Sequence, residues 1–481
     1  MIAPGIQYHV QLPLPRNWNE RFLHWGDGGK DGYLNFADHR VLQGYAVANS
    51  NMGHDEGSEP GASFGFNNRQ AEIDFGYRAV HLTVNAAKTL VRAYYGKPPK
   101  YSYHEGCSQG GREGLMEAQR FPYDFDGIVA GAPVNYYQQQ NANQVWLLQK
   151  IYRDKFAGAL AFDTDGDGRP DSLTKLKLLQ QAVLEKCDAL DGISDGVVDD
   201  PRRCRFDPET DLKNKLCPGD VNADQCFTRR QIQTVNDFYR GAHDSKGVRI
   251  YWGKARGSES EWAGSFIPHP GSLVPGGIRV SGDHLNYLFY ENDPGITPPD
   301  LQDLDYHLDK RANPPEWAWW EFNIDDFTVG KADLMMSIMN ATDPDLTRFL
   351  IKHNGKLLLY HGWCDAGPSP EGTIEYYNSI LKTTFAGKTE EAQKRIRLFM
   401  IPGMGHCGGG PGPNNWDKLK PLVDWVENAR LPDLLVATHT SGGKVDNERP
   451  VCAFPRTAVY TGPWGGQNTP SNWVAANFTC R

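Results

Sequence analysis

The stretch Gly106-Cys107-Ser108-Gln109-Gly110-Gly111 decides the fold, because it sets a serine among small residues between a strand and a helix. Residues 100–105 (KYSYHE) are expected to form the strand, and residues 111–120 (GREGLMEAQR) the helix that opens beneath the serine. Gly-x-Ser-x-Gly is the pattern of a nucleophile elbow, a strained turn that exposes a serine hydroxyl. Taken alone, the pattern also fits a plain turn in a glycine-rich chain.

A second stretch, Gly403-Met404-Gly405-His406-Cys407-Gly408, places a histidine beside a cysteine, as the first places a serine beside one. If Cys107 and Cys407 are bonded, their Cα atoms lie about 5.5–6 Å apart. Ser108 and His406 would then be drawn together although 298 residues (406 minus 108) separate them. A nucleophile held beside a general base is the arrangement that acyl-transfer enzymes need.

An acid is expected between the serine and the histidine in chain order and at the end of a strand, as α/β-hydrolases arrange it. Asp365 meets this condition, because residues 356–361 (KLLLYH) form an apolar run that a Gly-Trp-Cys turn ends. His406 likewise follows an apolar run, residues 396–401 (IRLFMI). A lone aspartate is usually a turn residue and a lone histidine a surface or satisfied residue. In this order, however, Ser108, Asp365 and His406 indicate a catalytic triad.

The order of segments predicts an α/β-hydrolase core with a mostly parallel sheet and a large inserted lid domain. The first portion alternates strands with helices, including a helix whose apolar stripe runs from Ile73 to Tyr94. Residues 135–345 lack this rhythm and are rich in aspartate, proline, glycine and aromatic residues. We therefore expect residues 1–134 and 346–481 to form the catalytic domain and residues 135–345 to form the lid.

Six motifs along the chain are specific in combination. They are Trp18-Asn19-x-Arg21-Phe22-Leu23, Gly106-Cys107-Ser108-x-Gly110-Gly111-Arg112, Gly127-Ile128-x-Ala130-Gly131-Ala132-Pro133, Cys187-Asp188-x-x-Asp191-Gly192, Tyr360-His361-Gly362-Trp363-x-Asp365 and Gly405-His406-Cys407. In these motifs, and over nearly its whole length, the chain resembles the tannase and feruloyl esterase family of α/β-hydrolases. The resemblance implies Ser108 as nucleophile, His406 as general base and acid, Asp365 as its orienting partner, and a supporting disulfide between Cys107 and Cys407.

The stretch Gly26-Asp27-Gly28-Gly29-Lys30-Asp31-Gly32 resembles the oxyanion loop of that family but carries Asp27 within it. An oxyanion hole needs backbone N–H groups that approach the substrate oxygen closely, which glycine permits. Gly28 or Gly29 would supply one N–H group, and Gln109, the residue after the serine, would supply the other. A second departure from the family is Cys364, directly before the acid, which we expect to be a free thiol.

Nine cysteines favour an oxidising compartment, although the count alone also allows metal sites or buried thiols. No Cys-x-x-Cys motif or histidine cluster accompanies them, so zinc is not expected. We expect a secreted or periplasmic hydrolase whose signal peptide has been removed, because Met1 leads almost directly into a strand-like segment. As in the family, local loops would be closed by Cys187 with Cys204, Cys217 with Cys226, and Cys452 with Cys480.

The lid contains an acidic loop with the side chains of Asp188, Asp191 and Asp195 and with glycines between them. Such a loop can collect oxygen atoms around one hard cation, the arrangement that calcium prefers. The resemblance implies a structural calcium ion in this loop, with the carbonyl groups of Ile193 and Val197 as further ligands. The alternative is an acidic turn exposed to solvent.

A second acidic loop lies at residues 163–171 (DTDGDGRPD). It matches the opening of a calcium loop, but Thr174 stands where a glutamate is expected at the twelfth position. This loop is either a weak calcium site or an exposed loop.

Substrate choice is expected to come from the lid. Its aromatic side chains offer flat apolar surface for an aromatic acyl group, although packing explains each of them singly. A carboxylate on the substrate would favour an arginine clamp, for which Arg279 and Arg311 are candidates. Galloyl, feruloyl and terephthaloyl esters stay equally open, because each has a ring beside the scissile carbonyl. The aromatic candidates are Tyr287, Phe289, Tyr290, Trp317, Trp319, Trp320, Phe322 and Phe327.

The composition excludes several classes of protein. A net charge of −9 and a pI near 5.9 argue against nucleic acid as a partner. No apolar run approaches 18 residues, so neither a transmembrane helix nor a membrane partner is expected.

The sequence thus predicts a serine carboxylic-ester hydrolase that acts through an acyl-enzyme on esters of aromatic acids. The substrate would be a small ester, or an ester attached to a polysaccharide or polymer, and the enzyme would use no organic cofactor. The alternative is a secreted, calcium-dependent module that binds carbohydrate or surfaces without catalysis; it explains the aromatic residues and disulfides but not the triad order. A metal-dependent hydrolase is disfavoured, because the aspartate loops lack histidines.

Overall fold

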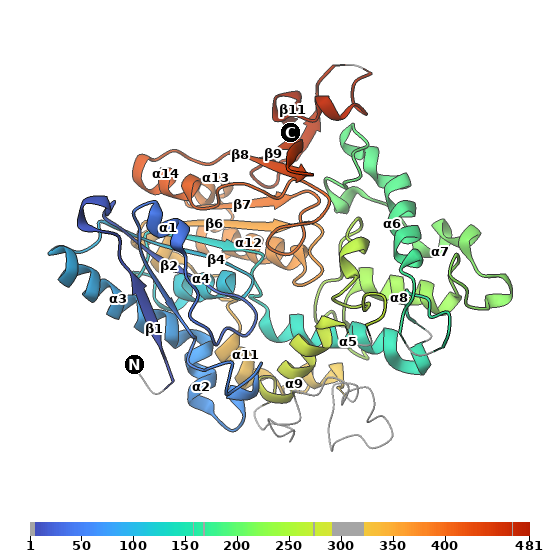
Figure 1. Cartoon of the computed structure of the whole chain (residues 1–481), viewed down its shortest axis with the longest axis horizontal. Helices are drawn as coiled ribbons and strands as arrows, with labels where there is room; N and C mark the ends of the chain where they lie inside the picture. Colours follow the sequence, from blue (N-terminus) through green and yellow to red (C-terminus); the bar gives the residue numbers. More distant parts are fainter. Residues whose placement is uncertain (1–4, 157, 167–168, 273–274, 291–321, 464) are drawn as a thin grey trace.

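A seven-stranded sheet forms the centre of the molecule in the computed structural model, which describes residues 5–156, 158–166, 169–272, 275–290, 322–463 and 465–481. The strand order is β1-β3-β2-β4-β5-β6-β7, and every neighbouring pair except β1 and β3 is parallel (Figure 1). This sheet confirms the predicted α/β fold class. The strands are β1 (Tyr8–Gln11), β2 (Arg21–Trp25), β3 (Ala46–Ser50), β4 (Tyr101–Cys107), β5 (Gly127–Gly131), β6 (Lys356–Gly362) and β7 (Ile396–Ile401).

The register of the parallel strands brings their carboxyl ends to one edge of the sheet. Cys107, the last residue of β4, is the partner of Gly131, the last residue of β5. Gly362, which ends β6, is likewise the partner of Ile401, which ends β7. The loops after β4, β6 and β7 therefore start from neighbouring positions, where α/β proteins build their sites.

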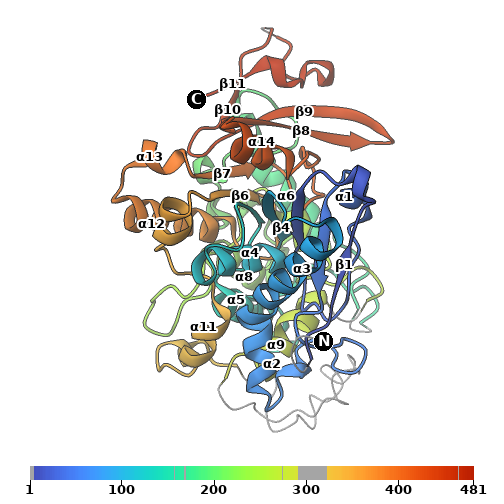
Figure 2. The same cartoon turned by 90° about the vertical axis from the view of Figure 1, so that its left-hand side faces the viewer.

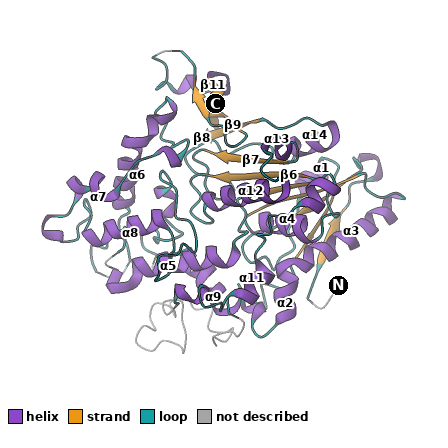
Figure 3. Cartoon of the chain, turned by 180° about the vertical axis from the view of Figure 1, so that it is seen from behind, coloured by secondary structure: helices purple, strands orange, loops and turns teal. Residues whose placement is uncertain are grey.

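Alternate side chains of each strand enter two different hydrophobic clusters, because successive residues of a strand point to opposite faces. In β6, Leu357 and Leu359 join the cluster shared with α3, α4 and α12, whereas Leu358 and Tyr360 join the cluster shared with α14 and β8–β9. Seen from behind, α3, α4 and α12 lie in front of the sheet (Figure 3). The core helices are α1 (Asp38–Leu42), α2 (Arg69–Ile73), α3 (Ala79–Tyr95), α4 (Gln109–Arg120), α12 (Pro370–Phe385), α13 (Thr389–Gln393) and α14 (Lys420–Asn428).

The helix expected from Ile73 to Tyr94 is interrupted by a π-helical turn at Asp74–Arg78, between α2 and α3. Arg112 of α4 gives a physical reason. Its guanidinium is fully buried and donates to the carbonyl oxygens of Phe75 and Gly76 at 2.9 and 2.7 Å. Such an irregular turn frees carbonyl groups that regular helical hydrogen bonds would otherwise use.

A lid is inserted between β5 and β6 and lies beyond the carboxyl ends of the strands (Figure 1). Its described residues form helices, turns and loops but no β-strand (Figure 3). A separate hydrophobic cluster, built from side chains between Ala142 and Ala332 together with Ala366 of the core, stabilises it. Its helices are α5 (Tyr137–Phe156), α6 (Thr174–Cys187), α7 (Pro208–Asp211), α8 (Arg229–Arg240) and α9 (Asp283–Tyr287), and α11 (Asp333–Met339) follows before β6.

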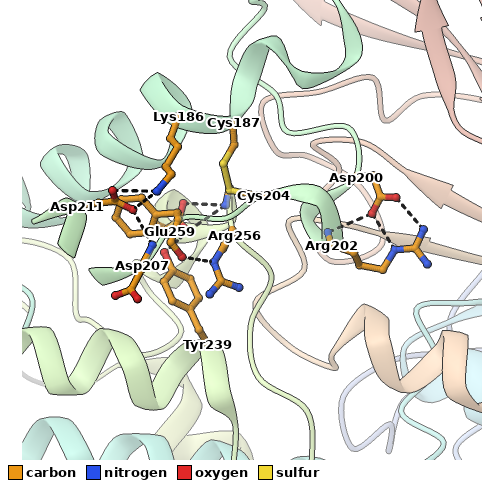
Figure 4. Close-up of a disulfide and its surroundings, with 12 residues drawn as sticks. Lys186, Cys187, Asp200, Arg202, Cys204, Asp207, Asp211, Tyr239, Arg256 and Glu259 are labelled. Carbon is orange, nitrogen blue, oxygen red and sulfur yellow. Dashed lines mark hydrogen bonds and ion pairs between the residues drawn. A yellow bond between two sulfur atoms is a disulfide. The ribbon is translucent and has the colours of Figure 1, made fainter. Parts of the chain in front are cut away.

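All four expected disulfides form, and Cys364 is a free, buried thiol, which confirms both predictions. Figure 4 shows the Cys187–Cys204 bond, which ties the end of α6 to the loop before α7 across a Cα–Cα distance of 5.3 Å. Nearby, the Tyr239 hydroxyl donates to the Glu259 carboxylate at 2.7 Å, which anchors the lid loop that approaches the core (Figure 4).

The chain ends in two small antiparallel units above β7 (Figure 2). A single bridge between Phe399 and Ala453 joins the first unit to the central sheet. The Cys452–Cys480 disulfide then ties the first unit to the second. The strands are β8 (Leu434–Ser441), β9 (Lys444–Cys452), β10 (Ala458–Tyr460) and β11 (Phe478–Cys480).

Candidate active site

Ser108 occupies a strained turn between β4 and α4. Its φ of 62° and ψ of −117° lie in a region that a non-glycine residue rarely adopts. The turn is tight: a Cβ atom at Gly106 would lie 2.4 Å from the Gly110 carbonyl oxygen, and a Cβ atom at Gly110 would lie 2.7 Å from the Asp27 oxygen. Glycine is therefore required on both sides of Ser108, as a nucleophile elbow demands.

Asp365 and His406 meet at the same edge of the sheet, in the loops after β6 and β7. His406 Nδ1 lies 2.7 Å from Asp365 Oδ2, and the Asp365 side chain is fully buried. A carboxylate only accepts hydrogen bonds, so Nδ1 carries the proton and Nε2 is the free base. The His406 side chain is 38% exposed, at the cavity that Ser108 also lines.

The Cys107–Cys407 disulfide joins the residues next to Ser108 and His406. The Cα atoms of the two cysteines are 5.9 Å apart, as expected for an unstrained bond. Ser108 and His406 line one cavity of about 660 Å³, together with the Gly26–Gly29 stretch. The structure thus brings the three predicted triad residues to one place, although they come from distant parts of the sequence.

Two hydrogen bonds fix the glycine-rich loop beside Ser108. The Gly26 N–H donates to the Glu105 carbonyl at 2.9 Å, and the Gly110 N–H donates to the Asp27 carbonyl at 2.6 Å. Gly28 and Gly29 are exposed in the cavity and have no atom within 4 Å of a Cβ position. An incoming carbonyl oxygen can therefore approach their backbone N–H groups.

Gln109 is the first residue of α4, so its N–H group has no acceptor within the helix. The helix dipole also favours negative charge at this end. The unexpected Asp27 side chain is restrained by Asn49, whose amide donates to it at 2.7 Å. Burial raises the pKa of Asp27, and the hydrogen bonds from Asn49 and Asn35 oppose that effect.

The electrostatics of the site favour an ionised acid and a basic histidine. Burial alone would raise the pKa of Asp365, but the charge of His406 and the hydrogen bonds from His361 and His406 outweigh it and hold this pKa well below its usual range. Burial alone would lower the pKa of His406, but the Asp365 carboxylate raises it overall. His406 is therefore a stronger base than an isolated histidine.

Lys254 of the lid contacts the loop that carries Asp365. The buried Lys254 ammonium donates to the Gly367 carbonyl, and the Gly367 N–H donates to Asp365 Oδ1 at 2.7 Å. Burial lowers the pKa of Lys254 to about 8, against the opposing effect of Asp365. The Lys254 charge in turn lowers the pKa of His406. Neither Lys254 nor His361 was a candidate from the sequence, although His361 stands within a recognised motif.

The acidic loop of the lid contains four carboxylates, three of which surround one buried cation, Arg449. The Arg449 guanidinium contacts Asp191 at 2.5 Å, Asp195 at 3.2 Å and Asp199 at 3.1 Å. Asp188 instead accepts the N–H groups of Asp195 and Gly196 at 3.2 and 3.0 Å.

Negative charge exceeds positive charge in this loop. Burial raises the pKa of Asp188 to about 6 and that of Asp199 to about 7, and neighbouring carboxylates add to both. The Asp195 Oδ1 atom is buried without a hydrogen-bond partner. A set of oxygen donors with excess charge and an unpartnered carboxylate oxygen fits a calcium ion.

The second acidic loop also brings carboxylates together. Ligand atoms of Asp163, Asp165 and Asp171 lie within 4.8 Å of one another, in an exposed position. Asp171 accepts the Thr164 N–H at 2.6 Å, and Asp163 accepts the Gly166 N–H at 2.7 Å. Residues 167–168 lie outside the described residues.

Of the aromatic candidates in the lid, those that the structure describes pack inside the lid or against the core. Tyr287 and Phe289 are fully buried, and Phe322 is 2% exposed. Phe289 packs edge-on against both Phe322 and Phe327, and the Tyr290 hydroxyl donates to Asp326. None of these side chains lines the catalytic cavity. The remaining candidates, Trp317, Trp319, Trp320, Arg311 and the side chain of Arg279, lie outside the described residues.

The fold, with Ser108, Asp365 and His406 in this order after the parallel strands β4, β6 and β7, is that of an α/β-hydrolase with an inserted domain. The sequence model of the family "Tannase and feruloyl esterase" matches residues 1–475. The chain belongs to this family and is a carboxylic ester hydrolase.

The chain aligns with named relatives over nearly its whole length. It is 33% identical to mono(2-hydroxyethyl) terephthalate hydrolase of Piscinibacter sakaiensis, over 98% of this chain and 82% of the relative. It is 30% identical to the probable feruloyl esterase B-1 of Aspergillus flavus, over 95% of this chain and 81% of the relative. The crystal structure of feruloyl esterase B from Aspergillus oryzae superposes with a TM-score of 0.79 at 26% identity, covering 99% of this chain and 87% of that one.

No helix in the described part of the chain combines the length and the apolar character needed to cross a membrane.

The Cys107–Cys407 bond is predicted to position the catalytic residues as well as to stabilise the fold. The double variant Cys107→Ala/Cys407→Ala should lose on the order of 100-fold in kcat, because a 1 Å misplacement has about that cost. Turnover should be measured well below the variant's own melting temperature. Replacing both cysteines together avoids a wrong pairing with Cys364, and the Cys452→Ala/Cys480→Ala variant controls for loss of a disulfide far from Ser108. Turnover near that of the wild type would leave only a stabilising role of about 2–5 kcal/mol.

Lys254→Met is predicted to move the acid limb of the pH profile of kcat/KM upward by about one pH unit, the order of magnitude expected for the loss of one nearby buried charge. The Lys254 ammonium disfavours protonated His406. Its loss raises the pKa of His406, so the free base is populated only at higher pH. Lys254→Arg, which keeps the charge, is the control. A lowered melting temperature with an unmoved acid limb would contradict the electrostatic role.

Proposed function

We propose that this protein hydrolyses esters of aromatic carboxylic acids through an acyl-enzyme on Ser108. The carrying observation is the hydrogen bond of 2.7 Å between His406 and Asp365, on the cavity that Ser108 also lines from a strained turn. Relatives named for terephthalate and feruloyl esters support an aromatic acyl group. Terephthalate esters and feruloyl esters are equally compatible with the proposed reaction.

The reaction proceeds in two displacements. His406 Nε2 takes the Ser108 hydroxyl proton while Oγ attacks the ester carbonyl, and the backbone N–H groups of Gln109 and of Gly28 or Gly29 stabilise the resulting oxyanion. Protonated His406 gives its proton to the departing alcohol, which leaves the acyl group on Ser108. Water, activated by His406, then releases the acid and restores the serine. Asp365 stays ionised and stabilises the imidazolium in each step.

We further propose that calcium is held by Asp188, Asp191 and Asp195 with the carbonyl groups of Ile193 and Val197. The support is the excess of carboxylates over the single Arg449 cation and the buried, unpartnered Asp195 Oδ1. This loop lies in the lid and does not line the catalytic cavity, so the ion would stabilise the lid and take no part in the chemistry.

We also propose that the enzyme works outside the cytoplasm. Four disulfides persist only where thiols are not kept reduced, as in secreted and periplasmic proteins.

The test of the proposed function is Ser108→Ala, which should lower ester hydrolysis by at least about 10³-fold while the melting temperature stays within a few degrees of the wild type. A serine-directed phosphonate should label the wild type at Ser108 and leave the variant unlabelled. Feruloyl, galloyl and mono(2-hydroxyethyl) terephthalate esters should be compared at equal concentration. Full hydrolysis by a folded Ser108→Ala protein would end the proposal.

Calcium removal is predicted to lower the melting temperature, since a ligand bound to the native state stabilises it by about 2.7 kcal/mol at 100 times its Kd. The Asp188→Asn/Asp195→Asn variant should start at the lower melting temperature and no longer respond to chelator. Asp163→Asn/Asp165→Asn, in the second acidic loop, is the matched control and should still respond. Metal analysis that finds no calcium in protein purified without chelator would contradict the site.

A further inference from the structure

The Asp365 carboxylate serves two histidines, of which the reaction above uses one. Its Oδ2 atom lies 2.7 Å from His406 Nδ1 and 3.1 Å from His361 Nε2. Its Oδ1 atom accepts the Gly367 N–H at 2.7 Å. The side chains of Asp365 and His361 are both 0% exposed. His361 therefore touches the acid from inside the core, on the β6 strand, and does not line the catalytic cavity.

Thr373 of α12 lies on the other side of the His361 ring, with its Oγ1 atom 2.8 Å from His361 Nδ1. Because an ionised carboxylate only accepts hydrogen bonds, His361 must present Nε2–H to Asp365. In a neutral imidazole the Nδ1 atom then carries a lone pair, which accepts the Thr373 hydroxyl proton. The hydroxyl thus supports the one neutral tautomer that can hold Asp365.

A buried carboxylate keeps its charge and orientation only when hydrogen bonds replace its lost water. The bond from His406 Nδ1 changes in strength during the reaction, because the ring is protonated at Nε2 and deprotonated again in each step. His361 and Gly367 are the partners of Asp365 that do not change during the reaction. His361 acts on Oδ2, the same oxygen that faces His406, so it controls the direction of the bond between acid and base.

We propose that His361 is a positioning residue of the ester hydrolysis, which holds Asp365 Oδ2 toward His406 and is itself held by Thr373. The inference rests on the proposed function, since it assigns a fourth and a fifth member to the proposed chain Ser108, His406 and Asp365. His361 touches neither the substrate cavity nor Ser108, and its effect passes through Asp365.

Other charged and titratable groups lie near His361 and Asp365, in the lid and in the loop that carries Asp365. Lys254 reaches the Gly367 carbonyl, and burial together with the Asp365 charge raises the pKa values of Glu261 and Tyr251. The Cys364 thiol donates to the Gly257 carbonyl, and burial raises its pKa. The hydrogen bonds of the His361 ring go to Asp365 and Thr373 and to none of these groups, so an altered pH profile after its substitution would report on the bond between His361 and Asp365.

The direct test replaces His361 with leucine, which cannot donate. We expect kcat to fall roughly 10- to 100-fold, the cost of a small misplacement, while KM changes less than about 2-fold. The acid limb of kcat/KM should move to higher pH, because an Asp365 oxygen that no longer serves His361 stabilises protonated His406 more strongly. The far-downfield proton resonance of the His406–Asp365 hydrogen bond should shift as well.

Two matched variants separate positioning from packing. His361→Gln places an amide N–H near the former Nε2 atom and should restore most of kcat and the wild-type acid limb. Thr373→Val keeps the shape of the side chain but removes the hydroxyl, and should show a weaker loss in the same direction. Thr373→Ser keeps the hydroxyl and should resemble the wild type. If His361→Leu fails to fold, the two Thr373 variants decide the question.

The proposal is overturned if folded His361→Leu or Thr373→Val protein keeps the wild-type kcat, acid limb and downfield resonance and loses only melting temperature. Ser108→Ala measured in parallel separates this failure from failure of the proposed function. An inactive Ser108→Ala with an unaffected His361→Leu refutes only the positioning role. An active Ser108→Ala refutes the serine mechanism itself, and the positioning role with it.

Discussion

Parallel pairing of β4, β5, β6 and β7 is the constraint on which the site depends. The pairing of Cys107 with Gly131 and of Gly362 with Ile401 sets the ends of these strands level with one another. Three loops from distant parts of the sequence therefore leave the sheet at the same edge. The backbone contact between Gly106 and Gly110 then bends the chain sharply enough to expose Ser108.

Covalent and polar contacts hold these loops in place once the sheet has aligned them. The Cys107–Cys407 disulfide restrains the two glycine-rich loops, which lack side chains of their own to pack. Gly367 links Asp365 to Lys254 of the lid. The lid is thus part of the environment of the acid, and loss of the Lys254 charge would change the pKa of His406.

Buried charge is compensated differently in the two polar centres of the molecule. In the catalytic centre, two imidazoles and a backbone N–H surround one carboxylate, so Asp365 stays ionised without a metal. In the acidic loop of the lid, three carboxylates, those of Asp191, Asp195 and Asp199, share a single guanidinium, that of Arg449. Hydrogen bonds suffice for one buried charge, whereas several like charges at close range favour a further cation, which is the basis of the proposed calcium site.

The sequence by itself determined the elements and the chemistry carried by local patterns. Gly-x-Ser-x-Gly and the apolar runs before Asp365 and His406 predict the fold class and the candidate triad, because each pattern depends on near neighbours in the chain. The pairing of the cysteines was implied by the resemblance to the family. Only the tertiary structure decided which side chains reach Asp365 from elsewhere. His361, Thr373 and Lys254 come from a strand, a helix and the lid, and their contacts arise from packing that no local pattern encodes. The burial of Tyr287 and Phe289 was decided in the same way, since an aromatic side chain has the same signature in a core as in a binding site.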